Sequence, residues 1–148
     1  MAKVSCWNPT GSNTNCMACV ARFLHAMLRG HNVDSVTSTR LELMSEPDTV
    51  QGNVAGLARQ RRNAVIRLAE IVQSVGLVEV DRHEAFFGRV YPAGYYAVIG
   101  LQSGHVISGH VRSDGCDFEM LFCPQSDRGY RLVELGPKVL AIRFRAVD

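Results

Sequence analysis

The sequence has no run of about 18 consecutive apolar residues, so we expect no transmembrane helix. No apolar stretch follows Met1, so we expect no Sec-type signal peptide. Internal repeats, low-complexity segments and linkers are also missing. The formal net charge of +2 is too small to indicate a nucleic-acid partner. With 47% hydrophobic and 20% charged residues the sequence is typical of a folded globular protein, and 148 residues predict one domain, 1–148.

The sequence lacks the even number of cysteines that a complete disulfide framework needs. There are five, so at least one thiol is free in a monomer: Cys6, Cys16, Cys19, Cys116 and Cys123. Free cysteine is among the most buried residue types. We therefore expect Cys6 and Cys116 to be buried, unreactive thiols.

A helix is predicted to follow the polar loop 8–15. Apolar residues recur at i, i+3, i+4, i+7 and i+8 and form one stripe: Val20, Phe23, Leu24, Met27 and Leu28. One of residues 13–15 is a suitable N-cap, and Gly30 stands where a C′ glycine belongs. Cys16 lies four residues before Val20 and extends the stripe to the mouth of the helix.

The rest of the chain predicts an α+β domain. Residues 31–53 look irregular, with Pro47 as a breaker. A second helix fits 64–75, with an earlier start possible at Leu57, and Gly76 is expected to end it. Its start carries a basic cluster that we interpret as a solvated face: Arg59, Arg61, Arg62 and Arg67. Strands are then predicted at 77–80, 95–101, 105–112, 118–122, 130–135 and 139–144. Successive hairpin-like strands after helices predict an antiparallel sheet on which the cysteine-bearing helix packs.

Cys16 is the candidate nucleophile. A cysteine attacks a carbonyl as its thiolate, and the unpaired N–H groups and dipole at a helix N-terminus favour that anion. The effect fades within the first turn, so Cys16 is favoured over Cys19, which we expect to be a packing residue. The same N–H groups, helped by the side chain of Asn13 or Asn15, are candidates for an oxyanion hole.

His105 is the candidate base. His25 lies nine positions after Cys16, too far along a helix that rises about 1.5 Å per residue. Two further histidines stand in polar, loop-like context and are expected to be exposed: His31 and His83. His105 and His110 face opposite sides of one predicted strand, so only one of them can face the helix. His105 follows Gly104 at the start of that strand, on its more apolar side, and is preferred.

A catalytic imidazole usually has a partner on its second nitrogen. A two-residue hairpin loop at Asp114-Gly115 would place His105 opposite Pro124. A loop that is one residue longer or shorter would place Cys123 or Gln125 opposite His105 instead. The side-chain carbonyl of Gln125 is a candidate acceptor from the imidazole, and so is the carboxylate of Asp127. We expect no metal and no cofactor.

Two stretches of the sequence resemble the papain-fold toxin domains of bacterial polymorphic toxins. The first comprises Asn8-Pro9, Gly11, Asn15-Cys16-Met17-Ala18-Cys19-Val20 and Leu28-Arg29-Gly30, and the second comprises 95–101, Gly104-His105-Val106 and Phe122-Cys123-Pro124-Gln125. The resemblance spans most of the chain and implies a papain-like fold with a catalytic cysteine at Cys16 and a catalytic histidine at His105. It also implies a protein deamidase or peptidase that is delivered without a Sec signal into the cytoplasm of a target cell, and that is paired with an immunity protein.

The sequence departs from this family at one position. The family usually has an aspartate where this chain has Cys123, just before Pro124-Gln125. The orienting role then falls to Gln125 or Asp127, or Cys16 and His105 act as a dyad.

Several functions remain open. One acyl-enzyme serves deamidation, proteolysis and transglutamination, and the preference for protein glutamine deamidation comes from the resemblance alone. Cys16-x-x-Cys19 also fits a redox motif, although that motif is normally preceded by a strand. Cys16 and Cys19 with His105 or Cys123 would supply ligands for zinc. A zinc nucleobase deaminase is disfavoured because no histidine precedes Cys16. A non-enzymatic binding module is the last alternative.

Overall fold

The computed structural model describes residues 4–45 and 54–147, and of residues 54–62 only the backbone. The helices are α1 (Cys16–Arg29), α2 (Ser35–Met44) and α3 (Val54–Gln73). The strands are β1 (Leu77–Ala85), β2 (Gly94–Gly100), β3 (Val106–Val111), β4 (Met120–Cys123), β5 (Arg128–Gly129) and β6 (Val139–Ala146), with a 3₁₀ helix η1 (Leu132–Leu135) before β6. Helices precede strands, so the predicted α+β class is confirmed. None of the helices in the described ranges is long and apolar enough to cross a membrane.

The predicted N-terminal helix is α1. It begins at Cys16, and Gly30 ends it with a left-handed φ of 82° while its N–H donates to the carbonyl of Ala26. Three members of the predicted stripe are buried: Val20, Phe23 and Leu24. Each such side chain contributes about 1.5–3 kcal/mol of burial free energy. Met27, near the far end, is 40% exposed, so the apolar stripe faces the protein interior mainly in the first three turns.

Helix α2 lies in the segment that we predicted to be irregular, so that prediction is wrong for Ser35–Met44. Leu41 is the buried residue of this helix, and the other apolar positions give no amphipathic stripe by which periodicity could reveal it. The local signal is instead the N-cap, because the Asp34 carboxylate accepts a hydrogen bond from the Thr37 N–H at 2.7 Å. Pro47 lies outside the described residues.

The second predicted helix is the C-terminal part of α3. It ends at Gln73, close to Gly76, and starts ten residues before the predicted 64. Its buried residues pack toward α1 and the sheet: Leu68, Ala69, Ile71 and Val72. In the predicted basic cluster Arg67 is half-buried, and the side chains of the other three arginines lie outside the described residues.

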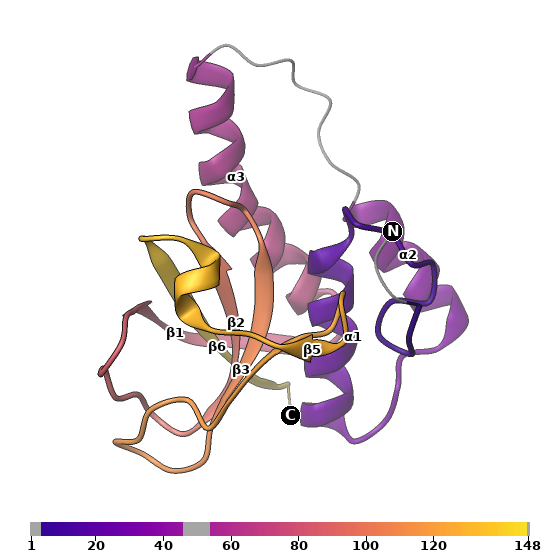
Figure 1. Cartoon of the computed structure of the whole chain (residues 1–148). Helices are drawn as coiled ribbons and strands as arrows, with labels where there is room; N and C mark the ends of the chain where they lie inside the picture. The colour runs from indigo at the N-terminus through magenta and orange to yellow at the C-terminus, as the bar shows by residue number, and fades with distance from the viewer. Residues whose placement is uncertain (1–3, 46–53, 148) are drawn as a thin grey trace.

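The strands form one antiparallel sheet in the order β1-β6-β2-β3-β4-β5, which confirms the predicted sheet (Figure 1). The strand predicted at 130–135 is wrong, since η1 occupies most of it. There the Glu134 carboxylate accepts from the Arg131 N–H at 2.8 Å and closes a helical turn.

The connection between β3 and β4 is longer than the predicted two-residue loop. It runs from 112 to 119, and Asp114-Gly115 forms one turn within it. Ser108 pairs with Phe122, one residue away from the register that a tight Asp114-Gly115 hairpin gives. If this register is extended to the residue before β3, His105 lies opposite Gln125, whereas the predicted two-residue loop would place it opposite Pro124.

Each face of the sheet has its own apolar core. Helices α1 and α3 cover one face, where Val106 and Ile142 of the sheet pack, and α2 packs against the outer side of α1 (Figure 1). The other face carries Ile107, Ala141 and Cys123 and is covered by loops and η1. Both faces of the central strands are therefore apolar.

Two tyrosines are buried in the core on the face of Ile107, and only one of them has a hydrogen-bonded hydroxyl group. Tyr96 donates to the carbonyl of Pro92 at 2.5 Å, whereas the Tyr91 hydroxyl, on a side chain only 1% exposed, has no partner with hydrogen-bond geometry among the described residues. We expect Tyr96→Phe to lower the free energy of unfolding by about 1 kcal/mol, because a satisfied buried bond is lost. Tyr91→Phe is expected to be neutral or stabilising. Urea unfolding of both variants checks this, and a larger loss from Tyr91→Phe would contradict it.

Candidate functional site

Cys16 is half-buried at the first position of α1. Asn15 is the N-cap residue, but its side chain makes no capping bond. Within the described part of the chain, the N–H groups of Cys16 and Met17 donate to no acceptor, while the next N–H, of Ala18, points to the Ser45 hydroxyl at 3.4 Å. The start of α1 therefore leaves two donors open beside the thiol.

The Asn15 side chain is committed to a buried network. Its Nδ2 donates to Asn8 Oδ1 at 2.8 Å and to Glu42 Oε1 at 2.9 Å, and its Oδ1 accepts from Gln125 Nε2 at 3.2 Å. The side chain is 3% exposed. Because both amide hydrogens are used, Asn15 donates to protein groups rather than to a bound oxyanion, which corrects that prediction. Asn13, the other predicted donor, is exposed.

Asn8 joins the N-terminal loop to a segment that is distant in sequence. Its side chain is fully buried, and Nδ2 donates to the backbone carbonyls of Gln125 at 2.9 Å and Ser12 at 3.0 Å. Its Oδ1 accepts from Asn15, so the whole carboxamide is satisfied. The loop that leads into Cys16 is thus fixed to residue 125 from both Asn8 and Asn15.

The network continues into α2 through a buried charge. The Arg22 guanidinium, 3% exposed, pairs with Glu42 at 2.7 Å and also donates to the Ser38 hydroxyl at 2.9 Å. Glu42 in turn accepts from Asn15. A buried guanidinium needs such partners, so α2 is held against the start of α1.

His105 lies just before β3, after Gly104 with a left-handed φ of 74°. Its imidazole Nε2 is 3.4 Å from the Sγ of Cys123, a thiol with no exposed surface, and its ring centroid is 5.3 Å from that of Tyr130. The contact of Cys123 with the imidazole was not predicted from the sequence. With Nε2 facing Cys123, Nδ1 is the ring nitrogen left for proton transfer.

The two predicted orienting residues are placed differently. The Gln125 side chain, 7% exposed, donates to Asn15, so it ties the strand end to the cysteine helix. Asp127 is half-buried with a left-handed φ of 55°, and its N–H donates to the carbonyl of Cys123 at 2.7 Å.

Segment 123–125 connects the two predicted catalytic residues. Cys123 contacts His105 at one end, and Gln125 bonds to Asn15, the neighbour of Cys16, at the other. Three residues span at most about 10 Å, so this segment confines both to one end of the sheet. Cys16 and His105 form no hydrogen bond with each other within the described ranges.

The remaining cysteines separate clearly. Cys19 is fully buried, and burial raises the pKa of its thiol well above its usual range; Arg22 opposes this rise, and Glu42 and the Cys16 and Cys123 thiols add to it. Cys19 is thus a packing residue, as predicted. Two thiols that we expected to be buried are instead exposed: Cys6 and Cys116.

His105 was preferred partly because we expected the odd-numbered residues of its strand to face the helix, and this expectation is wrong. Within β3 the residues on the side of the helices are even-numbered, as Val106 packs with α1, whereas Ile107 packs in the second core. His110 lies on the helix side, stacked on Tyr95 and paired with Glu119. His105 precedes the strand and sits at its rim.

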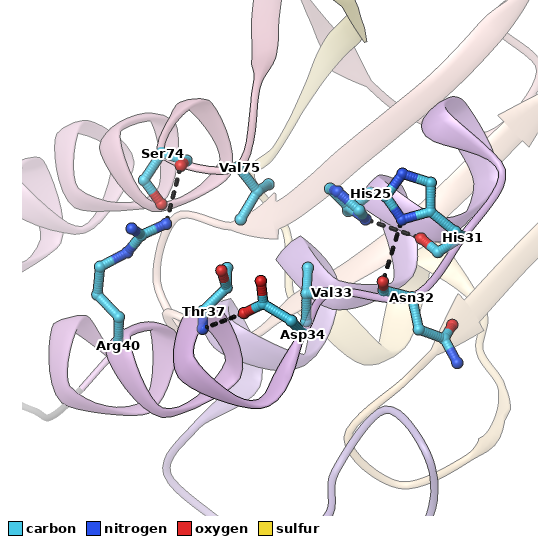
Figure 2. A pocket seen from close by; sticks show the side chains of 9 residues that line it. All are labelled: His25, His31, Asn32, Val33, Asp34, Thr37, Arg40, Ser74 and Val75. Carbon is cyan, nitrogen blue, oxygen red and sulfur yellow. Dashed lines mark hydrogen bonds between the residues drawn. The ribbon is translucent and has the colours of Figure 1, made fainter.

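The other histidines are engaged elsewhere. His25 is buried, and its Nδ1 donates to the carbonyl of His31 at 2.9 Å. Both imidazoles and Arg40 line a hollow of about 310 Å³ near the C-terminal end of α1. Figure 2 shows how these side chains lie. His31 is exposed as predicted, but His83 is half-buried and pairs with Asp81 at 2.9 Å, so that expectation is wrong.

Two alternative chemistries gain no support. Among the residues the structure describes, no three His, Cys, Asp or Glu side chains are grouped so that they would hold a metal ion. A redox motif at Cys16 and Cys19 would follow a strand, whereas β1, the first strand described, comes after all three helices, and Cys19 is inaccessible.

Comparison of the chain with models of protein families, with curated proteins and with solved structures gives no match.

Proposed function

We propose that the protein is a cysteine-dependent acyl-transfer hydrolase of papain-like fold, and that it acts as a protein glutamine deamidase. The observation that carries the proposal is the link through 123–125, which ties the helix start bearing Cys16 to the imidazole of His105. A half-buried thiol at an uncapped helix start, with an imidazole held at the same end of the sheet, is an arrangement suited to nucleophilic catalysis.

In the proposed reaction the Cys16 thiolate attacks the carboxamide carbon of a substrate glutamine. The open N–H groups of Cys16 and Met17, with the exposed Asn13 amide nearby in sequence, stabilise the oxyanion. His105 gives its proton to the departing ammonia, leaving a thioester on Cys16. It then takes a proton from water, which attacks the thioester and releases glutamate, so that the Cys16 thiolate and the protonated His105 are regenerated.

In this mechanism Cys123 holds His105. A thiol in contact with Nε2 fixes the ring orientation, as the third member of a triad does. A neutral thiol stabilises the imidazolium less than a carboxylate does, and this favours a second candidate, a protein that binds its partner with little or no turnover. Gln125 and Asp127 shape the segment that carries Cys123.

The choice of glutamine as substrate and the biological role rest on the resemblance to polymorphic-toxin domains. The proposed role is that of an effector that is delivered into a target cell, acts on a protein substrate there and is paired with a cognate immunity protein. Proteolysis or transglutamination at the same site are the closest alternatives, because they share the acyl-enzyme and differ in the leaving group or the acceptor.

Product analysis distinguishes these reactions. We expect the purified protein, incubated with a glutamine-rich protein such as casein, to convert side-chain amides to carboxylates with stoichiometric release of ammonia and no chain cleavage. Peptide mass spectrometry and an ammonia assay measure both. New chain termini would establish a peptidase, amine incorporation a transglutaminase, and no covalent change across target-cell proteins would support the binding role.

A further inference from the structure

An apolar groove lies beside the candidate site. Its walls are formed by Phe87, Phe118, Leu121, Tyr130, Leu132 and Val133, together with Asp117 and Arg131, and it encloses about 420 Å³. We call it the Phe87 groove. Its volume is in the range of sites that receive a small ligand or a few side chains of a polypeptide.

The walls of this groove carry two strongly exposed apolar side chains. Phe87 is 97% exposed in the connection after β1, and Val133 is 73% exposed in η1. Large apolar side chains that gather at a hollow, with aromatic rings and arginines around them, are typical of surfaces that bind protein.

The groove is connected to His105 through Tyr130. Tyr130 lines the groove and also contacts His105, ring centroid to ring centroid at 5.3 Å. A chain lying in the groove would therefore pass close to His105.

Three arginines lie in or near the walls of the groove. Arg89 lies over the rings of Phe86 and Tyr91, and within the described ranges neither Arg89 nor Arg131 forms an ion pair. Arg128 lies over Tyr130 at 4.0 Å and pairs with Glu134. The one carboxylate in the lining, Asp117, accepts from the Phe118 N–H.

We infer that the Phe87 groove binds the polypeptide substrate through a large apolar side chain flanked by acidic residues. The apolar side chain fills the hollow, and the acidic neighbours pair with Arg89 and Arg131. This inference rests on the proposed function for its choice of a substrate as the occupant.

Peptide selection on the Cys16→Ala protein tests this binding without turnover. Short random peptides are displayed and selected, and the enriched peptide is labelled and its affinity measured by fluorescence anisotropy. We expect enrichment of Phe, Leu or Met next to Asp or Glu. Val133→Glu and Phe87→Ser should each weaken binding by about ten-fold or more. Both positions are exposed, so folding is unaffected, and Val36→Glu, at a 79% exposed site on α2, is the matched control with no expected effect.

Enrichment that is the same on Val133→Glu protein, or no enrichment at all, would overturn the inference. So would a dimer in sedimentation that Val133→Glu dissociates, because the groove would then bind a second copy. Failure of the proposed function looks different: Cys16 would be unreactive while the selected peptide still bound the groove.

Discussion

Cys16→Ala is expected to reduce the hydrolytic activity by about 10³-fold or more, because the proposed reaction forms its acyl-enzyme on the Cys16 thiol. Such a loss corresponds to at least about 4 kcal/mol of transition-state stabilisation. Cys19 is fully buried, and Cys123 is buried against His105. The variant should keep its fold, because Cys16 is only half-buried and its side chain makes no hydrogen bond within the described residues. Ammonia release and circular dichroism measure the two properties.

Two further cysteine variants are the controls for this prediction. Cys19→Ala removes a buried thiol one turn away and should cost about 1 kcal/mol of stability with activity retained. Cys6→Ser alters an exposed thiol and should change neither property. If activity survives Cys16→Ala but is lost in Cys19→Ala, the assignment of Cys16 as the nucleophile is wrong.

Asn8→Ala is expected to lower the free energy of unfolding by about 2–4 kcal/mol and also to slow the reaction of Cys16. The substitution leaves the carbonyls of Ser12 and Gln125 and one hydrogen of the Asn15 amide without their buried partner. The loop that leads to Cys16 is then no longer tied to the backbone of residue 125, which holds the His105 side of the site. Asn8 thus acts as a positioning residue.

A loss of stability alone would not show that Asn8 positions the loop before Cys16. A variant that removes another buried hydrogen bond, away from this loop, is therefore the control. Ser108 donates to the carbonyl of Phe122 at 2.9 Å and is fully buried. Ser108→Ala should destabilise by about 1 kcal/mol without changing the alkylation rate of Cys16 in the folded protein. Asn8→Ala should slow that rate several-fold at a temperature where both variants are folded. Equal rates in the two variants would reduce Asn8 to a structural residue.

Local signals were enough to predict the helix that carries Cys16 and the antiparallel sheet. A continuous stripe, a polar loop before it and Gly30 after it define α1, and β-branched runs define most strands. Helix α2 was missed because its one buried residue, Leu41, gives no periodicity, and 130–135 was misassigned because the capping by Glu134 overrides its β propensity.

The internal geometry of the site could not be predicted in the same way. The bond from Asn8 to Gln125 joins residues 117 positions apart, and the contact of Cys123 with His105 depends on a register that the long 112–119 connection leaves open. Asn15 looked like an oxyanion donor by its position next to Cys16, and only the neighbouring side chains of Asn8 and Glu42 show that its amide is occupied.

The most direct test of a Cys16–His105 pair is the rate of iodoacetamide alkylation of each cysteine across a pH series, read by peptide mass in wild type and in His105→Ala. Cys6 and Cys116 are exposed and Cys16 is half-buried, so accessibility alone would make the alkylation of Cys16 the slowest of the three. The account predicts that Cys16 is nevertheless alkylated fastest below pH 8.5, about the pKa of a free thiol, and that His105→Ala slows it selectively. If Cys16 is alkylated no faster than Cys6 or Cys116 and His105→Ala changes nothing, the enzyme proposal is contradicted and a binding function becomes the better account.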